Sequence, residues 1–316
     1  MNIKLKKLLY LPHPRGFCAG VDRAINIVEL SLDKYGPPIY VRHEIVHNPW
    51  VIKDLESKGV IFIENLKDAP EGSRVIFSAH GIPISVLNEA KNKEMPFIDA
   101  TCPLVIKVHN EAKRLHKDGA HIFLIGHEGH PEVVGTMGQV PQDAITLIQN
   151  KEDIKKIDSN KYKKVALITQ TTLSVDDTRE ITKEFKNIFS EIIIPPKEDI
   201  CYATTNRQLA IKSIANDCDL IYVIGANNSS NSLRLVEVGK KSGCNQTYLI
   251  SDVSEVDWKK IEKEQKIGLT AGASAPDILI QDFIDKMSQL YDVEIKNISV
   301  ADENITFKIP RELNER

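Results

Sequence analysis

The sequence predicts an α/β protein whose three units repeat the same alternation of strand and helix. Short apolar runs of strand length alternate with longer amphipathic runs of helix length, which is the pattern of parallel βαβ units. The alternation restarts twice along the 316 residues, and a cysteine stands at a similar stage of each repeat, in a loop that opens a helix-like run. We therefore expect three α/β units of roughly 100 residues each, although length alone would favour about two domains.

The periodicity of apolar residues gives the expected elements of each unit. In the first unit, strands are expected at 6–11, 38–42, 60–64 and 74–79, and helices at 21–36, 48–59 and 83–93. In the second, which starts from the apolar run at 96–100, strands are expected at 121–126, 144–148 and 164–169, and helices at 103–119 and 174–189. In the third, which starts from the apolar run at 190–195, strands are expected at 219–225, 246–250 and 266–271, and helices at 203–217, 229–243 and 275–290.

We place the domain boundaries between these repeats. Domain 1 covers residues 1–97, domain 2 covers 98–195 and domain 3 covers 196–281. The tail, 282–316, is expected to pack back on domain 1, because residues 292–310 alternate like a strand pair.

Composition narrows the classes of function. A net charge of −3 gives no strong attraction to nucleic acid, so we expect no nucleic-acid partner. No apolar stretch approaches the ~20 residues that cross a bilayer, and the apolar run near the N-terminus is too short for a signal peptide, so we expect a cytoplasmic protein without a membrane partner. Five cysteines without short paired spacings favour metal or catalytic roles over disulfides.

Three of the cysteines, Cys18, Cys102 and Cys201, stand in loops that open a helix-like run. A helix N-terminus stabilises thiolate, the form of cysteine that binds metal. Three converging thiolates can hold a [4Fe-4S] cluster and leave one iron without a protein ligand, which is the cofactor we expect. Zinc remains an alternative, although structural zinc sites usually carry a short Cys-x-x-Cys pair. Cys218 and Cys244 lie elsewhere in the pattern and are interpreted as structural.

Polar residues fill the other loops that follow strands, where open α/β sheets bind ligands. His47, His80 and His130 lie in such loops, and Thr171 follows the strand at 164–169. Glu132, close to His130, is either a proton donor or only the acidic first turn of a helix. Its pKa depends on the balance between burial and nearby positive charge.

The third unit contributes hydroxyls and an amide. Ser229, Ser230 and Asn231 lie at an expected helix start, and Ser274 lies in a glycine-containing loop. Backbone N–H groups and hydroxyls at helix starts form oxyanion or phosphate sites, although the same residues also serve as ordinary N-caps. Because Lys and Arg are largely missing from these loops, the anion would be enclosed by neutral donors.

Taken together, nine sequence blocks resemble the LytB/IspH family of 4-hydroxy-3-methylbut-2-enyl diphosphate reductases. The blocks span residues 15 to 281 and depart from the family pattern at no motif position. They read RGFCAGVDRAI, YVRHEIVHN, FSAHG, DATCPLV, GHEGHPEVVGTMGQ, TQTTLSVDDT, DICYATTNRQ, NNSSNS and TAGASAPDILIQ.

The resemblance implies a trefoil of three pseudo-symmetric α/β domains around a central [4Fe-4S] cluster held by Cys18, Cys102 and Cys201. It implies a two-electron removal of the allylic hydroxyl as water, which yields isopentenyl and dimethylallyl diphosphate in the last step of the non-mevalonate pathway. Glu132 would supply protons, with Thr171 near the substrate hydroxyl. His130 would relay protons and touch the diphosphate. The remaining diphosphate contacts implied by the family are His47, His80, Ser229, Ser230, Asn231 and Ser274.

Electrons are expected from an external ferredoxin or flavodoxin, since no nucleotide-binding glycine fingerprint follows the first strand. Two rival hypotheses remain at this point. One is a three-cysteine cluster enzyme that only dehydrates, of the quinolinate-synthase type, which would need carboxylate-binding cations. The other is a noncatalytic zinc or cluster protein that senses a phosphometabolite.

Overall fold

The computed structural model describes residues 4–195 and 198–314, and its chain divides into two compact units. The first unit comprises Met1–Ala19, His47–Val51 and Tyr202–Ile305. The second comprises Gly20–Val46, Ile52–Cys201 and Thr306–Arg316. The strand pairs of the described residues form parallel sheets of five, four and three strands, which confirms the predicted α/β class.

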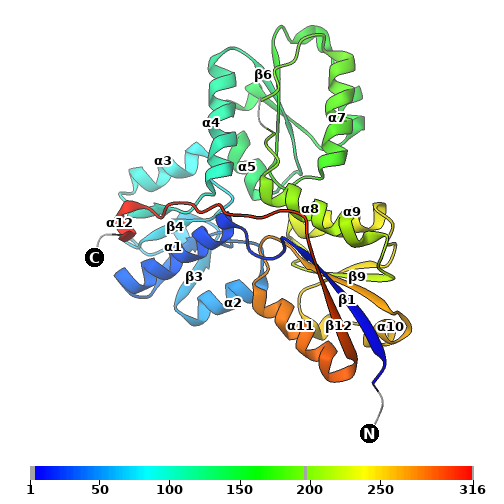
Figure 1. Cartoon of the computed structure of the whole chain (residues 1–316). Helices are drawn as coiled ribbons and strands as arrows, with labels where there is room; N and C mark the ends of the chain where they lie inside the picture. The colour runs from blue at the N-terminus through cyan, green and yellow to red at the C-terminus, as the bar shows by residue number, and fades with distance from the viewer. Residues whose placement is uncertain (1–3, 196–197, 315–316) are drawn as a thin grey trace. The chain divides into compact units, whose positions relative to one another are not determined.

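The five-stranded sheet belongs to the first unit (Figure 1). Its strand order is β10-β9-β11-β1-β12, with β1 at Lys6–His13, β9 at Leu220–Ile224, β10 at Thr247–Ile250, β11 at Lys266–Ala271 and β12 at Asp292–Ser299. Successive residues of β9 point to opposite faces. Tyr222 packs in the core formed with α11 (Asp277–Leu290), whereas Ile221 packs in the core formed with α8 (Tyr202–Ala215) and α9 (Ser230–Lys241).

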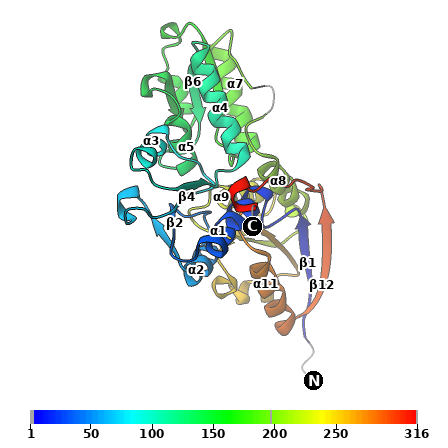
Figure 2. The same cartoon turned by 90° about the vertical axis from the view of Figure 1, so that its left-hand side faces the viewer.

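The first and last strands differ from the expected grouping. β1 hydrogen-bonds to β11 and to β12 and so joins the sheet of the third repeat, not the sheet of the first. Figure 2 shows β1 and β12 side by side. Which strand pairs with which depends on long-range packing, here of Leu9 and Leu11 with Leu269 in one core. Of the strand pair expected over 292–310, only β12 forms. The domain boundaries remain a prediction, and the one at 195/196 adjoins residues 196–197, outside the described part of the chain.

The four-stranded sheet lies in the second unit and has the order β3-β2-β4-β5. Its strands are β2 (Ile39–Arg42), β3 (Val60–Ile63), β4 (Val75–Phe77) and β5 (Phe97–Asp99), and the helices of this part of the chain are α1 (Ala19–Tyr35), α2 (Pro49–Ser57) and α3 (Ile84–Asn92). Val75 and Phe77, on one face of β4, form a core with Ala90 of α3. The loop that follows β4 carries His80, and the loop that follows β5 carries Cys102.

The three-stranded sheet, also in the second unit, has the order β7-β6-β8. Its strands are β6 (His121–Ile125), β7 (Ile145–Ile148) and β8 (Val165–Thr169), and its main helices are α4 (Pro103–Lys117), α5 (Pro131–Met137) and α7 (Val175–Ile188). The alternation of β6 places Ile122 in the core with α4 and Phe123 in the core with α7. The two helices therefore cover opposite faces of this sheet, as Figure 1 shows.

Short elements account for the remaining differences from the expected pattern. Residues 190–195 form no strand, because only Ile193 makes a bridge, to Ala166, and Pro195 has no N–H to donate. The short helices are too brief for periodicity to reveal. They are α6 (Lys151–Lys155), α10 (Trp258–Lys263) and α12 (Arg311–Asn314), with 3-10 turns at Leu66–Asp68, Gln142–Ala144, Ser159–Lys161 and Val253–Glu255. No helix within the described ranges is both long and apolar enough to cross a membrane.

Candidate functional site

Each of the three predicted cysteine ligands immediately precedes a helix. Cys18 precedes α1, Cys102 caps α4, and Cys201 precedes α8. Backbone hydrogen bonds fix all three loops. The N–H of Cys18 donates to the carbonyl of Ala273 (3.3 Å), that of Cys102 to Ala79 (3.0 Å) and that of Cys201 to Thr171 (3.1 Å). The positive end of each helix dipole therefore lies beside a thiol and favours its thiolate form.

The five cysteines fall into two groups. The thiols of Cys218 and Cys244 are buried in the five-stranded sheet's core, and burial raises the pKa of both. Their environment opposes the thiolate that metal binding requires. The other group is partly exposed and comprises Cys18, Cys102 and Cys201. Because each of these thiols stands at a helix start that favours thiolate, they fit an iron–sulfur cluster as ligands. Cys18 belongs to the first unit and the other two to the second. Among residues 4–195 and 198–314, no three His, Cys, Asp or Glu side chains are grouped for a metal ion.

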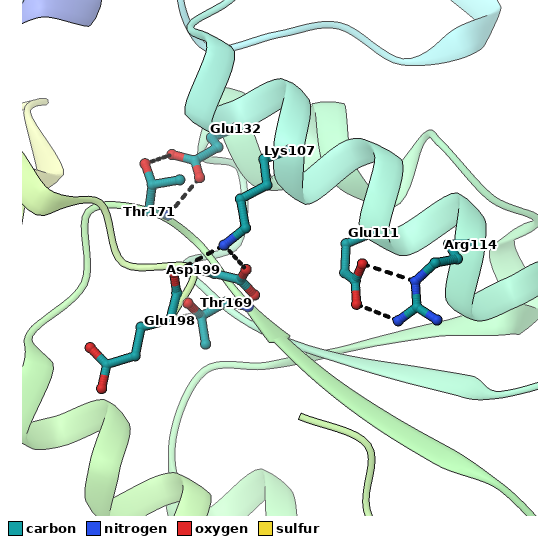
Figure 3. Close-up of polar contacts among 8 residues, drawn as sticks. All are labelled: Lys107, Glu111, Arg114, Glu132, Thr169, Thr171, Glu198 and Asp199. Atoms are coloured by element: carbon teal, nitrogen blue, oxygen red, sulfur yellow. Dashed lines mark hydrogen bonds and ion pairs between the residues drawn. The ribbon is translucent and has the colours of Figure 1, made fainter. Parts of the chain in front are cut away.

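A buried carboxylate–threonine pair lies at the ends of α5 and β8 in the second unit (Figure 3). Glu132 is 3% exposed and Thr171 is 4% exposed. One carboxylate oxygen of Glu132 accepts the backbone N–H of Thr171 (2.6 Å), and the other accepts the Thr171 hydroxyl (3.0 Å). Gly129, with a φ of 76°, makes the turn that leads into this helix start. The carboxylate is thus held from two directions by one residue.

Burial raises the pKa of Glu132 to about 7, and the two hydrogen bonds from Thr171 only partly offset this effect. The negative charge of Asp199 raises the pKa of Glu132 further. An acid with a pKa near 7 exists in both its protonated and its ionised form at neutral pH. Such an acid is suited to general acid–base chemistry.

Two histidines accompany this pair in the second unit. The Nδ1 atom of His130 accepts the backbone N–H of Glu132 (3.2 Å), so a neutral His130 carries its proton on Nε2. The rings of His80 and His130 are in edge contact, with 6.0 Å between their centroids. The hydroxyl of Ser78 lies 3.3 Å from Nδ1 of His80. The structure therefore brings four predicted site residues, His80, His130, Glu132 and Thr171, into one connected group.

A second buried carboxylate, Asp199, lies near the Glu132–Thr171 pair, next to Lys107 (Figure 3). Its side chain is 1% exposed and forms an ion pair with Lys107 of α4 (3.3 Å). Its other oxygen accepts the backbone N–H of Thr169 at the end of β8 (3.1 Å). Burial raises the pKa of Asp199, while Lys107 acts in the opposite direction. Asp199 therefore ties the loop that leads to Cys201 to the end of β8.

The other predicted polar residues gather at the start of α9 in the first unit. Ser229 is the N-cap of α9, and its hydroxyl accepts the backbone N–H of Ser232 (3.4 Å). The capping interpretation is therefore correct for Ser229. Ser230 and Asn231 are 7% and 5% exposed, and neither amide atom of Asn231 has a hydrogen-bond partner in the described residues. A buried amide without partners is costly unless a ligand binds it.

Two glycines allow this helix start to lie close to neighbouring strand ends. A Cβ atom on Gly225, after β9, would lie 2.1 Å from the Ser232 hydroxyl oxygen, and one on Gly272, after β11, would lie equally close to it. Any side chain at either position would collide with Ser232. A Cβ on Gly272 would also lie 3.4 Å from the side-chain amide nitrogen of Asn231, so the glycine leaves space beside that amide.

His47 and Ser274 form a third contact in the first unit. The hydroxyl of Ser274 donates to the backbone carbonyl of His47 (2.9 Å). Nδ1 of His47 lies 3.3 Å from the side-chain amide nitrogen of Asn228. Asn228 connects His47 to the loop before Ser229, so His47, Ser274 and the start of α9 form one connected group.

Sequence reasoning did not single out Asn228, Ser232 or Asp199. Asn228 and Ser232 lie inside the GANNSSNS block, where the run of small polar residues was a signal. Asp199 stands two positions before Cys201, in EDICY, and its acidic character next to an apolar stretch was the only hint of burial.

The LytB protein family matches residues 9–288 of the chain. The chain belongs to the LytB family. Two curated LytB relatives are named 4-hydroxy-3-methylbut-2-enyl diphosphate reductase. The protein from Paracoccus denitrificans is 51% identical over 315 residues, which covers 100% of both chains. The protein from Roseobacter denitrificans is 52% identical over 307 residues, which covers 97% of both.

Solved structures of LytB proteins agree with this assignment. The E-1-hydroxy-2-methyl-but-2-enyl-4-diphosphate reductase of Plasmodium falciparum is 42% identical, with a TM-score of 0.94 over 98% of this chain and 97% of that one. A second structure, of (E)-4-hydroxy-3-methyl-but-2-enyl diphosphate reductase, described as the terminal enzyme of the non-mevalonate pathway, is 31% identical, with a TM-score of 0.65 over 90% of this chain and 99% of that one.

Proposed function

We propose that this protein catalyses the reductive dehydroxylation of 4-hydroxy-3-methylbut-2-enyl diphosphate to isopentenyl and dimethylallyl diphosphate, the last step of the non-mevalonate isoprenoid pathway. The observation that carries the proposal is the full-length match, at 51% identity, to a curated reductase of that name. In this reaction the allylic C–O bond breaks and a C–H bond forms. Two electrons and two protons enter, and the oxygen leaves as water.

The electrons require a redox cofactor, for which the three partly exposed cysteines are the fitting ligands. Cys18, Cys102 and Cys201 would hold a [4Fe-4S] cluster, which when bound supplies single electrons and an iron without a protein ligand that acts as a Lewis acid. The thiols of Cys218 and Cys244 are buried and their raised pKa opposes ionisation, so they take no part.

The protons would come from Glu132 through Thr171. A hydroxyl both donates and accepts, so a protonated Glu132 would donate to the Thr171 oxygen while Thr171 turns its own proton toward the substrate hydroxyl. The pKa of about 7 lets Glu132 hold a proton at neutral pH and release it during turnover. With its proton on Nε2, His130 would donate a hydrogen bond to the diphosphate or pass that proton on in a relay.

The diphosphate would be bound by neutral donors. In the first unit these are His47, Ser229, Ser230, Asn231 and Ser274, to which the second unit would add His80. The unpartnered amide of Asn231 supports this role most directly, because a phosphate oxygen would satisfy its N–H donors. Backbone N–H groups at the start of α9, together with its dipole, would add to the attraction.

A ferredoxin or flavodoxin is proposed as the electron donor, and the cytoplasm as the compartment. The donor follows from the reaction, which needs low-potential electrons from outside the chain. Neither partner nor compartment enters the test below, which uses a chemical reductant.

The decisive test is an anaerobic assay of the purified protein with the allylic diphosphate and a chemical reductant, together with its visible spectrum and metal content. We expect a brown protein with close to four irons per chain and formation of both isoprenoid diphosphates. A colourless protein with stoichiometric zinc would overturn the proposal. A brown protein that binds the diphosphate without turnover would instead favour a sensor.

Matched cysteine variants identify the ligands. Cys102→Ser should lose most of the iron and the activity. Cys218→Ser, which changes a buried thiol of the first unit, should retain both. Iron loss in the Cys218 variant would show that the ligand assignment is wrong.

A further inference from the structure

Arg207 is a fully buried cation in the first unit, with 0% of its side chain exposed. Burying a charge is costly unless ion pairing and hydrogen bonds compensate for the lost water. Arg207 lies on α8, the helix that begins directly after Cys201. The reaction proposed above assigns no role to this residue, although its sequence block, DICYATTNRQ, also contains that cysteine.

The guanidinium donates to the loop that carries Cys18. Its Nε atom donates to the carbonyl of Gly16 (3.0 Å), and Nη2 donates to the carbonyls of Gly16 (2.7 Å) and Phe17 (3.0 Å). These are the two residues that immediately precede Cys18. Hydrogen bonds from a charged donor are stronger than those between neutral groups, and the rigid fork of arginine lets one side chain reach both carbonyls.

The remaining nitrogen of Arg207 binds its own helix and the counterion. Nη1 donates to the carbonyl of Ala203 (3.0 Å) and to both carboxylate oxygens of Glu303 (3.1 and 3.3 Å). The side chain of Glu303 is 13% exposed, and it also accepts from the amide of Asn206 (3.1 Å). The charge of Arg207 is therefore balanced by a carboxylate that is itself held in place by α8.

The opposite side of the same loop is fixed by the β11–α11 connection. The N–H of Gly16 donates to the carbonyl of Ala271 (3.2 Å), and the N–H of Cys18 donates to Ala273 (3.3 Å). Gly16 has a φ of 71°, and a Cβ there would lie 3.2 Å from the carbonyl oxygen of Ala275. The backbone at 16–18 thus donates its N–H groups to the β11–α11 connection, and its carbonyls accept hydrogen bonds from Arg207.

We propose that Arg207, with Glu303 as its counterion, is a positioning residue that fixes the Cys18 loop to α8, the helix that begins after Cys201. One side chain would then set the placement of the Cys18 loop against a helix that is far from it in sequence. The inference takes from the proposed function only the assignment of Cys18 and Cys201 as cluster ligands. A lysine cannot replace Arg207, because a single ammonium group cannot span both loop carbonyls, Ala203 and Glu303 together.

The test compares Arg207→Lys and Arg207→Met with Lys7→Met. Lys7 is a matched control, because it is a 5% exposed cation of the same unit that donates to two backbone carbonyls, those of Glu262 and Glu264, at the end of β1 away from Cys18. All three substitutions should lower the melting temperature of the apoprotein. Only the Arg207 variants should lose cluster absorbance to a chelator about tenfold faster than the wild type.

A second readout does not depend on the cluster. In the apoprotein, alkylation of Cys18 by iodoacetamide, followed by peptide mass spectrometry, should be about tenfold faster in the Arg207 variants than in the Lys7 variant. Alkylation of Cys218, which is buried, should be equal in both. If Arg207→Met is insoluble, Arg207→Lys and Glu303→Gln provide the same comparison.

Equal cluster loss and equal Cys18 alkylation in the Arg207 and Lys7 variants would overturn the inference, because Arg207 would then act only through overall stability. If the wild type holds no iron after anaerobic reconstitution, the proposed function fails, and the alkylation comparison alone decides the role of Arg207.

Discussion

Two regions of the molecule that lie at strand ends bury polar groups, but one buries an ionisable acid and the other a neutral amide. At the end of β8 in the second unit, Glu132 is a buried carboxyl whose oxygens are both hydrogen-bonded by Thr171. At the start of α9 in the first unit, Asn231 is a buried neutral amide without partners in the described residues. We call Glu132 and Thr171 the acid region, in which the ionisable carboxyl has hydrogen-bond partners. We call the start of α9 around Asn231 the neutral region, in which the amide donors have no partner among the described residues.

The difference indicates how each region would act. A buried carboxyl that already has its hydrogen bonds needs no further ligand, and burial instead raises its pKa into the range of proton transfer. A neutral region with unsatisfied donors favours an anion, and a carboxylate in that region would repel one. The charge of the buried group thus distinguishes the proposed proton donor, Glu132, from the proposed anion-binding amide, Asn231.

The largest expected effect tests the acid region. Glu132→Gln keeps the size of the side chain and removes the transferable proton, so turnover should fall by about 10²- to 10⁴-fold. Iron content and binding of the diphosphate should be retained, because neither depends on the proton. Steady-state kinetics with a chemical reductant and an iron assay check this prediction.

Glu111→Gln is the matched control for Glu132→Gln. Glu111 also lies in the second unit, with 17% of its side chain exposed, but it pairs with Arg114 away from Thr171 (Figure 3). Turnover in the Glu111 variant should match the wild type. Near-normal turnover in the Glu132 variant would remove Glu132 from the role of proton donor.

The next effect tests the neutral region. Asn231→Asp places a negative charge where the diphosphate is proposed to bind, and should raise KM about 100-fold, whereas Asn231→Ala removes only the amide donors and should raise KM about tenfold. kcat should change much less in the Ala variant than KM does. Asn245→Asp, an exposed position of the same unit, provides the control. An Asp variant that binds substrate as well as the Ala variant does would contradict the anion assignment.

The sequence predicts the strands and helices better than it predicts whether the buried polar groups are charged. The run at 122–125 is apolar throughout because both of its faces are covered, so its strand was evident. The strands that pair with β1 were not evident from the sequence, because the pairing of parallel strands depends on packing between distant segments. The polar residues of both regions could be named from their strand-end loops. The pKa of Glu132 could not be predicted, because burial outweighs hydrogen bonding only in the folded protein.

The smallest effect concerns pH. With a pKa of about 7 for Glu132, the protonated fraction declines as pH rises through neutrality. If this proton is required, kcat/KM should decrease about tenfold per pH unit above that pKa. The residual kcat/KM of Glu132→Gln should not show this decrease with pH. A wild-type profile that stays flat to pH 9 would contradict the assignment.

Thermal stability reveals the direction of the Glu132 pKa shift without an activity assay. The pKa of Glu132 is raised from 4.5 to about 7, so the folded state binds a proton more tightly than the unfolded chain does. The resulting contribution to the free energy of unfolding is fully present below pH 4.5 and is lost as pH rises through about 7. The melting temperature of the wild type, relative to that of Glu132→Gln, should therefore decline over this window and level off above it. A difference that grows with pH would mean that hydrogen bonds to Glu132 outweigh its burial, and the acid region would then hold an ionised carboxylate.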